Sequence, residues 1–295
     1  MDEYELQLPE GVLIADAGGT KVDWAIGGAE GVTHLRTQGI HPYFQDAASV
    51  RSTLKAEEAS FGIDPHGIQR IHFYGAGCSS AVRKRRIEDG LRGVFPNASI
   101  EVEHDLLGAA RAVSANEPGF LAILGTGSNA CSFDGSRIVE QSGGLGYILG
   151  DEGSGAHLGK LLLRELLNGD LPRELEEKFR KAYAVDRDRM IDQIHRGEAP
   201  SRYLAGFAPF LKEHEEHEHI KELIEGSFRE FIERHVLRFK GSKGGVLHTV
   251  GSIGLHFRSC LERVLEEMGS KPGRSIADQE VIKGLVEYHH TGSER

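Results

Sequence analysis

The sequence contains one local pattern twice, and this repeat constrains the fold more than any other feature. An apolar segment, Gly11–Asp16 (GVLIAD), leads into the glycine-rich turn Gly18-Gly19-Thr20 and then into a hairpin of two strand-like segments. Further along the chain, Phe120–Leu124 (FLAIL) leads into Gly125-Thr126-Gly127 and a second hairpin. Self-similarity of this kind indicates two domains of related topology.

Strand-like and helix-like segments alternate around the repeat. In the first half we expect a helix from the N-cap candidate Asp46 to about Phe61, a strand at Arg70–Tyr74 and another at Ser99–Glu103. The second half is mostly helical over residues 172–240 and ends in a helix at about Asp278–His289. Strands that alternate with helices after an initial meander of strands predict a three-layer α/β architecture.

A turn at Asn116-Glu117-Pro118-Gly119 separates the two copies of the pattern. We therefore expect an N-terminal domain over residues 1–117 and a C-terminal domain over residues 118–295. The C-terminal domain carries the helical segment as an insertion, and the last helix can pack back on the N-terminal domain.

The overall charge excludes several classes of partner. The 45 acidic side chains outnumber the 35 basic ones and give a net charge of −10. Proteins that bind nucleic acids or anionic membranes normally carry the opposite sign or a concentrated basic face. The one basic run, Arg83-Lys84-Arg85-Arg86, lies in an expected helix, and we interpret it as a solvated helix face.

The cysteines and the first residues indicate a cytoplasmic protein. Cys78, Cys131 and Cys260 are widely separated and form no CxxC motif, so neither a zinc site nor a disulfide framework is expected. The first residues, MDEYELQLPEG, lack the features of a signal peptide. No apolar run approaches the roughly 18 residues that a membrane span requires.

Both glycine-rich turns have the composition of phosphate-binding loops. In Asp16-Ala17-Gly18-Gly19-Thr20-Lys21 (DAGGTK), the glycines let backbone N–H groups approach a phosphate, and Thr20 adds a hydroxyl donor. Asp16 can hold a magnesium ion, through water, against the phosphates. Gly125-Thr126-Gly127-Ser128-Asn129 (GTGSN) can clasp the same phosphates from the other side. Each turn alone could be an ordinary tight turn, but two at equivalent positions of a repeat favour a shared ligand.

Two acidic segments complete the candidate site. The run from Gly143 to Gly155 (GGLGYILGDEGSG) contains Asp151 and Glu152, whose carboxylates can accept hydrogen bonds from sugar hydroxyls. Its alternative interpretation is a flexible surface loop. Asp105 lies at an expected strand-to-helix junction, where a carboxylate can orient an alcohol and take its proton. An ordinary helix N-cap is the alternative for Asp105.

The motifs DAGGTK, GAG, EHDLLGAARA, GTGSN, GGLGYILGDEGSG, AGF and VGSIG occur in this order. Together they resemble the BadF/BadG-type ATPase and N-acetylglucosamine kinase family, from Ile14 to about His289. The resemblance implies two actin/ribonuclease-H-like domains with an interdomain cleft for ATP, magnesium and an amino sugar. It implies phosphorylation of the sugar 6-hydroxyl and a homodimer.

The resemblance also implies a role for individual residues, with Asp105 as the catalytic base. The residues implied for ATP and its phosphates are Asp16, Gly18, Gly19, Thr20, Lys21, Gly125, Thr126, Gly127, Ala205, Gly206, Gly251 and Ser252. Those implied for the sugar are His41, Ser128, Asn129, Gly144, Leu145, Gly146, Asp151 and Glu152. His41 departs from the family pattern, in which an asparagine usually faces the sugar. Histidine has a different reach and a titratable charge, so N-acetylglucosamine, N-acetylmuramate, glucosamine and other hexosamines stay open as substrates.

Two other functions remain as alternatives. An activator ATPase for a dehydratase would bridge its subunits with an iron–sulfur cluster, but Cys78 and Cys131 lack the expected paired context. A non-catalytic sugar or nucleotide sensor would not require Asp16, Asp105 and both phosphate loops.

Several histidines are not expected to take part in function. His214, His217 and His219 are spaced so that they do not share one helix face, and we predict a solvated helix rather than a metal site. His289-His290 is interpreted as a frayed helix end.

Overall fold

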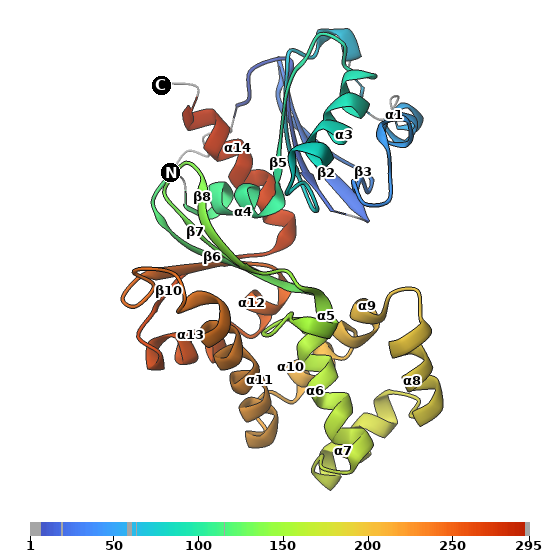
Figure 1. Cartoon of the computed structure of the whole chain (residues 1–295), viewed down its shortest axis with the longest axis vertical. Helices are drawn as coiled ribbons and strands as arrows, with labels where there is room; N and C mark the ends of the chain where they lie inside the picture. The colour runs from blue at the N-terminus through green and yellow to red at the C-terminus, as the bar shows by residue number, and fades with distance from the viewer. Residues whose placement is uncertain (1–6, 19, 58–60, 63, 115, 293–295) are drawn as a thin grey trace. The chain divides into compact units, whose positions relative to one another are not determined.

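The computed structural model describes residues 7–18, 20–57, 61–62, 64–114 and 116–292 (Figure 1). Gly19 of the first predicted phosphate loop therefore lies outside the described residues. The chain divides into two compact units. The first comprises residues up to 117 together with 135–137 and those from 279 onward, and the second comprises 118–134 and 138–278.

The first unit is built on a five-stranded sheet of order β3-β2-β1-β4-β5. Its strands are β1 (Val12–Ala17), β2 (Lys21–Gly28), β3 (Gly31–Gln38), β4 (Arg70–Gly75) and β5 (Ser99–His104). The hairpin strands pair antiparallel, whereas β1, β4 and β5 run parallel.

Helices cover both faces of this sheet. α1 (Ala47–Ala56) and α3 (Ala81–Arg92) contribute to a core that includes Leu13, Ala15 and Ala17 of β1, every second residue of the strand. α4 (Asp105–Ser114) and α14 (Val281–Gly292) contact each other and β1. The predicted three-layer α/β arrangement is confirmed, as is the N-cap Asp46, whose carboxylate accepts from the Ser49 N–H.

The second unit repeats the same topology. Its sheet has the order β10-β9-β6-β7-β8, in which β6 pairs antiparallel with β7 and parallel with β9. The strands are β6 (Gly119–Leu124), β7 (Ser128–Phe133), β8 (Ile138–Gly143), β9 (Val246–Val250) and β10 (Lys271–Ile276). The repeat predicted from the sequence is therefore confirmed at the level of strand order and direction.

Most helices of the second unit lie between β8 and β9 in sequence. They are α5 (Gly146–Leu149), α6 (Gly155–Asn168), α7 (Arg173–Ala182), α8 (Arg187–Arg196), α9 (Pro200–Ala205), α10 (Ala208–Glu213), α11 (Glu218–Phe231) and the π-helical turn η2 (Ile232–Val236). Two more, α12 (Ser252–His256) and α13 (Arg258–Glu267), follow β9. No helix among the described residues is long and apolar enough to cross a membrane.

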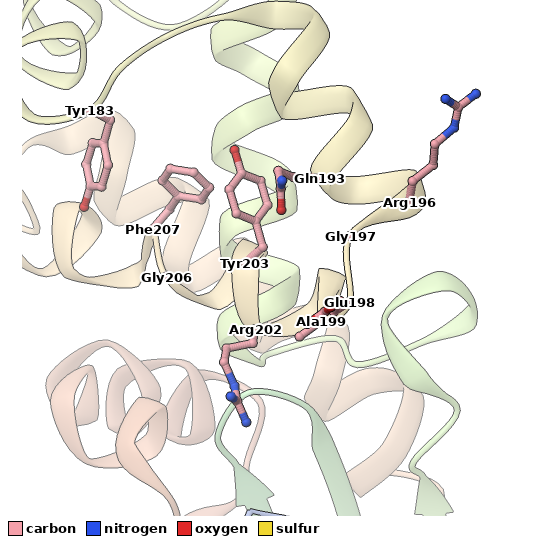
Figure 2. A pocket seen from close by; sticks show the side chains of 10 residues that line it. All are labelled: Tyr183, Gln193, Arg196, Gly197, Glu198, Ala199, Arg202, Tyr203, Gly206 and Phe207. Atoms are coloured by element: carbon pink, nitrogen blue, oxygen red, sulfur yellow. The ribbon is translucent and has the colours of Figure 1, made fainter.

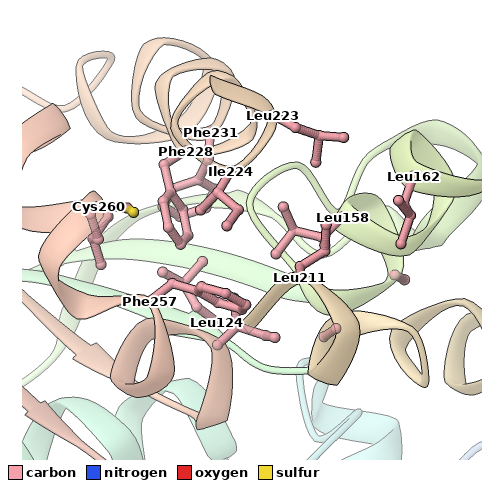
Figure 3. Packing of buried hydrophobic residues seen from close by; sticks show 14 of the residues in the cluster. Leu124, Leu158, Leu162, Leu211, Leu223, Ile224, Phe228, Phe231, Phe257 and Cys260 are labelled. Carbon is pink, nitrogen blue, oxygen red and sulfur yellow. The ribbon is translucent and has the colours of Figure 1, made fainter. Parts of the chain in front are cut away.

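The core of the second unit joins these helices to the sheet. Figure 3 shows Leu124 at the end of β6, Leu158 of α6 and Phe257 after α12 within one buried cluster. Phe228 and Phe231 of α11 pack into the same cluster. The end of β6, where the second predicted phosphate loop begins, is therefore fixed by apolar packing.

Helices α6 and α9 approach so closely that a side chain at their crossing is excluded. A Cβ atom at Gly159 of α6 would lie 1.9 Å from the carbonyl oxygen of Leu204 in α9. One turn earlier, a Cβ atom at Gly155 would lie 3.0 Å from the Ala205 Cβ. The two glycines are four residues apart and share one helix face, so they set the position of α9.

The last helix is fixed in the first unit by packing and by a polar network. Gly284 of α14 packs against Ala112 of α4 at a distance that excludes a Cβ atom. His289 accepts or donates a hydrogen bond of 2.8 Å with the Tyr74 hydroxyl, and its ring stacks on His72 at 3.9 Å. The prediction that His289 belongs to a frayed helix end is therefore wrong, because the ring is held among β4 side chains.

One helix boundary and one strand differ from the sequence predictions. α1 ends at Ala56 rather than near Phe61. The strand β10 was not predicted, because Pro272 and Gly273 interrupt its pattern. It is an edge strand with an irregular register between Pro272 and Ser275, and proline is tolerated at an edge.

We predict that Gly159→Ala destabilises the protein by more than about 2 kcal/mol, because the new methyl group would collide with the Leu204 backbone. Gly226→Ala is the matched control, since Gly226 also lies inside a helix but has no atom within 4 Å of its Cβ position. The control should stabilise by about 0.5–1 kcal/mol. Urea denaturation of both variants measures the difference, and equal effects would contradict the tight crossing.

We also predict that the free energy of unfolding decreases as the pH falls from about 6.5 to 3. Burial, and then the charges of His72 and Arg111, lower the pKa of His289 to about 3. The unfolded chain binds this proton near the ordinary value of 6.5, so in this window it holds more protons than the folded chain. One such proton contributes at most about 1.4 kcal/mol per pH unit.

His289→Gln retains a hydrogen-bonding group and removes the titration, so its unfolding free energy should depend less on pH between 7.5 and 5. His290→Gln is the control, because His290 is exposed and its ring bonds the carbonyl oxygen of Gln7. Urea denaturation at the two pH values provides the measurement. An unchanged pH dependence in His289→Gln would refute the assignment.

Candidate functional site

In the first unit, the carboxyl ends of the three parallel strands lie in one row. Ala17 of β1 pairs with Gly75 of β4, and Gly75 pairs with His104 of β5. The Ala76 N–H donates to the Ala17 carbonyl oxygen at 2.9 Å. Open α/β sheets bind ligands beyond the carboxyl ends of their strands. The β1–β2 turn, the Gly75–Gly77 turn and Asp105 therefore share the edge where a ligand is expected.

Predicted phosphate residues of the first unit lie at and beside this edge. Asp16 is half-buried near the end of β1, and Thr20 and Lys21 follow the turn into β2. The Gly18 N–H donates to the Lys21 carbonyl oxygen at 2.9 Å and closes the turn. The Lys21 ammonium forms a 2.9 Å ion pair with Asp23, so it is directed along β2.

His41 reaches the same edge from the segment after β3. The Gly39 N–H donates to the Thr20 carbonyl oxygen at 3.1 Å, which fixes this segment beside the first turn. The His41 ring lies against Gly77, where φ is +77° and a Cβ atom would lie 2.9 Å from the imidazole. Burial lowers the pKa of His41 although the nearby Asp105 charge raises it. The imidazole is therefore neutral near pH 7 and can both donate and accept a hydrogen bond.

Asp105 is the first residue of α4, and its side chain is 31% exposed. One carboxylate oxygen, Oδ1, lies 2.8 Å from His104 Nδ1 and accepts from the Leu106 N–H at 2.8 Å. These contacts orient the carboxylate while it remains accessible. Cys78 lies behind the edge, and burial raises the pKa of its thiol to about 12, so it is not an activated nucleophile.

In the second unit, the Gly125–Gly127 turn is attached to the start of α6. The Gly155 N–H donates to the Gly125 carbonyl oxygen at 2.9 Å, and the Ala156 N–H donates to that of Thr126 at 3.1 Å. Ser154 caps the helix by accepting from the His157 N–H. The first turn of α6 thus holds the loop in place.

Gly251 brings β9 against the same turn. Its φ is +117°, and a Cβ atom there would lie 2.5 Å from the Leu124 carbonyl oxygen. Both the conformation and the contact therefore require glycine. As a result, Ser252 at the start of α12 is placed beside the Gly125–Gly127 turn.

These segments surround a cavity of about 660 Å³, which we call the α9–α12 pocket. Its lining includes the predicted nucleotide residues Gly125, Thr126, Ala205, Gly206 and Ser252. The sequence did not predict the remaining lining residues, which are Arg202, Ala208, Pro209, Lys212, Glu213, Ile253, His256 and Phe257. The volume lies in the range of small-molecule sites, and apolar walls with a few polar groups are typical of them.

A second pocket of about 660 Å³ adjoins the first and shares Arg202 and Gly206 with it. Figure 2 shows the aromatic rings of Tyr183, Phe207 and Tyr203 along this pocket, while Arg196 extends away from it. No sequence pattern predicted this pocket, because its residues come from helices whose spacing resembles that of ordinary amphipathic helices.

The glycine-rich segment after β8 lies against the predicted sugar residue Asn129. The Gly144 N–H donates to the Ser128 carbonyl oxygen at 3.0 Å, and a Cβ atom at Gly144 would lie 3.1 Å from Asn129 Nδ2. Gly144 and Gly146 have φ values of +70° and +78°. Leu145 between them is 61% exposed.

Asp151 and Ser128 form a buried polar pair. Asp151 has a φ of +62°, and its Oδ1 accepts from the Ser128 N–H at 3.3 Å. Burial raises the pKa of Asp151, and this hydrogen bond partly offsets the increase. The Ser128 hydroxyl is buried without a hydrogen-bond partner in the described part of the chain. A buried polar group of this kind is available to a ligand.

The Glu152 carboxylate bonds a histidine rather than the Ser128 backbone that Asp151 bonds. It is buried, its Oε2 lies 3.0 Å from His235 Nε2, and Arg234 lies 3.7 Å from its Oε1. Burial alone would raise the pKa of Glu152, but the bond to His235 and the nearby charges lower it. The carboxylate is therefore ionised and bound to protein groups.

Among the described residues, no group of three or more His, Cys, Asp or Glu side chains is arranged to hold a metal ion. His217 pairs with Glu174 at 2.6 Å, and His219 pairs with Glu165 at 2.6 Å. These histidines connect α11 to α7 and α6. The predicted solvated helix is wrong for this segment, because α10 ends at Glu213 and α11 begins at Glu218 with His217 as its N-cap.

Comparison with solved structures establishes the family. A Porphyromonas gingivalis protein described as a "putative N-acetylglucosamine kinase" is 38% identical, over 96% of this chain and 99% of its own, with a TM-score of 0.86. The chain belongs to the N-acetylglucosamine kinase family. This is a family of ATP-dependent sugar kinases with the two-domain actin-like fold, so the predicted resemblance and fold class are confirmed.

More distant members of the fold agree with the N-acetylglucosamine kinase architecture. A "putative N-acetylglucosamine kinase" from Chromobacterium violaceum is 17% identical over 93% of this chain and 98% of its own, with a TM-score of 0.67. A "putative sugar kinase" from Cytophaga hutchinsonii is 16% identical over 94% and 98%, with a TM-score of 0.51. No protein-family model and no curated protein matches the sequence.

Proposed function

We propose that this protein transfers the γ-phosphoryl group of ATP to the 6-hydroxyl of an N-acetylhexosamine. N-acetylglucosamine is the first candidate, and N-acetylmuramate is the second. The observation that carries the proposal is the oriented, accessible carboxylate of Asp105 at the carboxyl edge of the first sheet, beside His41 and the β1–β2 turn. The family relationship supports the same reaction.

In this proposal the nucleotide occupies the α9–α12 pocket, with Gly125 and Thr126 near its phosphates and Ala205, Gly206 and Ser252 near its nucleoside. Gly18 and Thr20 of the first unit supply further phosphate contacts. Magnesium keeps several water ligands and needs few protein carboxylates when phosphates are present. Asp16 fits this requirement as a single half-buried carboxylate, and the ion would neutralise phosphate charge.

In the same proposal, the acceptor sugar contacts His41 of the first unit and the buried pair Ser128 and Asp151 of the second unit. The free hydroxyl of Ser128 and the amide of Asn129 offer donors and acceptors, and Asp151 offers a carboxylate. Gly144 and Gly146 have no Cβ atoms, so a ligand can approach the backbone of this segment closely. The two units then act as domains that close on the substrates, with the last helix α14 belonging to the first domain.

The reaction balances with the residues proposed. Asp105 accepts the proton of the sugar 6-hydroxyl as its oxygen attacks the γ-phosphorus. The bond from the γ-phosphorus to the bridging oxygen breaks, and ADP leaves with that oxygen. The products are ADP, the hexosamine 6-phosphate and one proton. The homodimer implied by the family resemblance belongs to this proposal as well.

The activator ATPase alternative receives little support from the cysteines. Cys78 and Cys131 are both buried, and burial raises the pKa of each thiol to about 12. Ligation of an iron–sulfur cluster requires accessible thiolates. The sensor alternative predicts ligand binding without turnover, so measured release of ADP in the presence of a hexosamine would contradict it.

We predict that Asp105→Asn lowers kcat for hexosamine phosphorylation by at least about 100-fold, because the amide cannot accept the hydroxyl proton. ATP binding should change little, since Asp105 lies outside the α9–α12 pocket. A coupled ADP-release assay over a panel of hexosamines and calorimetric titration with ATP measure the two quantities. Full activity of the variant would eliminate the proposed mechanism.

We predict that Ala205→Leu raises the KM for ATP at least about tenfold and leaves the KM for the sugar nearly unchanged, because the larger side chain enters the α9–α12 pocket. Ala199→Leu is the matched control, since Ala199 lines only the adjoining pocket. If the control raised the KM for ATP as much as Ala205→Leu, the nucleotide would belong in the adjoining pocket.

A further inference from the structure

One imidazole bonds both ends of the glycine-rich loop that carries Asp151. This loop, residues 143–151, begins after Ser142 and ends before Glu152. His235 Nδ1 lies 2.9 Å from the Ser142 hydroxyl, and His235 Nε2 lies 3.0 Å from Glu152 Oε2. His235 and Glu152 are buried, so these bonds form away from water.

We propose that His235 is a positioning residue for the acceptor sugar: it clamps the base of the 143–151 loop and so holds the sugar-facing groups of that loop in place. The proposal rests on the proposed function only in assigning the sugar to this loop. The clamp itself follows from the contacts of His235, whatever the ligand.

The chemistry of Glu152 fixes the proton on His235 Nε2. An ionised carboxylate only accepts hydrogen bonds, so Nε2 carries a proton and donates to Glu152. The Ser142 hydroxyl can donate to or accept from Nδ1, so this second bond does not depend on the charge of the ring. Both nitrogens are then satisfied within the buried network, which makes the loss of either partner costly.

The helix that carries His235 also makes two contacts with Gly153, which lies two residues after the loop. The Gly153 N–H donates to the Ser227 hydroxyl of α11 at 3.2 Å. Gly153 has a φ of +75°, and a Cβ atom there would lie 2.9 Å from the Phe231 Cβ. Ser227, Phe231 and His235 are each four residues apart and form one contact stripe.

The π-helical turn keeps His235 in that stripe. In a regular α-helix, residues four apart point in directions that differ by roughly 40° about the helix axis. Three such residues in a row would therefore not all face the same neighbour. The turn η2 contains His235 and has an i to i+5 bond, from the Leu237 N–H to the Ile232 carbonyl oxygen at 2.9 Å. The wider π turn rotates His235 back toward the direction of Ser227 and Phe231. Turns of this kind are frequent at functional sites.

The clamp matters because the loop is strained at its base and exposed at its tip. A φ of +62° at Asp151 is an unfavourable backbone conformation for a non-glycine residue. Leu145, Ile148 and Leu149 near the tip are 61%, 74% and 76% exposed. Tyr147 is the residue of the tip that packs against the core, and the contacts at the base hold Asp151 against Ser128.

The first test compares KM values. We expect His235→Leu to raise the KM for the hexosamine at least about tenfold while the KM for ATP changes less than about twofold. The α9–α12 pocket contains no residue of the loop, which is why nucleotide binding should be spared. His217→Leu is the matched control, because His217 also pairs with a glutamate, Glu174, but its ring bonds neither end of the loop. A rise in both KM values, or none in the sugar KM, would overturn the proposal.

Ser142→Ala is a milder variant that keeps the Glu152–His235 bond and serves if His235→Leu fails to fold. Loss of one hydrogen bond should raise the sugar KM about threefold. In the double variant, Ser142→Ala should add nothing to His235→Leu, since its effect passes through the imidazole. An unchanged KM in Ser142→Ala, or full additivity, would contradict the clamp.

A second readout separates the clamp from the kinase reaction. Chymotrypsin cleaves after aromatic residues, and Tyr147 lies within the loop. We expect His235→Leu to be cleaved there at least about fivefold faster than the unmodified protein, because local opening limits proteolysis. If the unmodified protein phosphorylates no hexosamine, the proposed function fails, whereas unchanged cleavage at Tyr147 would refute the clamp.

Discussion

Close backbone approach is the constraint on which the candidate nucleotide site depends. At Gly159 in the α6–α9 crossing and at Gly251, the chain comes so near to its neighbour that no side chain fits, and at Gly155 a Cβ atom would lie only 3.0 Å from the Ala205 Cβ. These contacts bring four separate segments to one place: the β6–β7 turn, α6, α9 and the start of α12. Larger residues at these positions would separate the segments and open the pocket walls.

The two units use their shared topology in different ways. In the first, the parallel strands align a carboxylate, an imidazole and a glycine turn along one edge. In the second, the equivalent edge is enclosed by helices and becomes a cavity. One strand arrangement thus supports an accessible acid–base group in one unit and an enclosed binding pocket in the other, which agrees with the principle that function depends on the site rather than the fold.

Much of this fold was predictable from the sequence, because glycine turns after apolar strands are strong local signals. The repeat, the three-layer arrangement and the turn at 125–127 followed from them, and the polar residue before α1 marked the N-cap Asp46. The strand β10 was missed because Pro272 and Gly273 break the pattern that marks a strand. His289 was misjudged and His235 was overlooked for one reason: a histidine near a helix end has the same local pattern whether its ring is solvated or bonded to distant residues. Hydrogen bonds between residues far apart along the chain produce no periodic pattern in the sequence.

The place of α14 has a consequence for biosynthesis. This helix covers part of the first sheet, with Gly284 against Ala112, yet it is separated from that sheet by the whole second unit along the chain. On the ribosome, the first unit emerges early but lacks a layer of its core until α14 has been made. The apolar face that α14 covers stays exposed or loosely covered while the second unit is synthesised. Deletion of α14 should for this reason disturb the amino-terminal unit first.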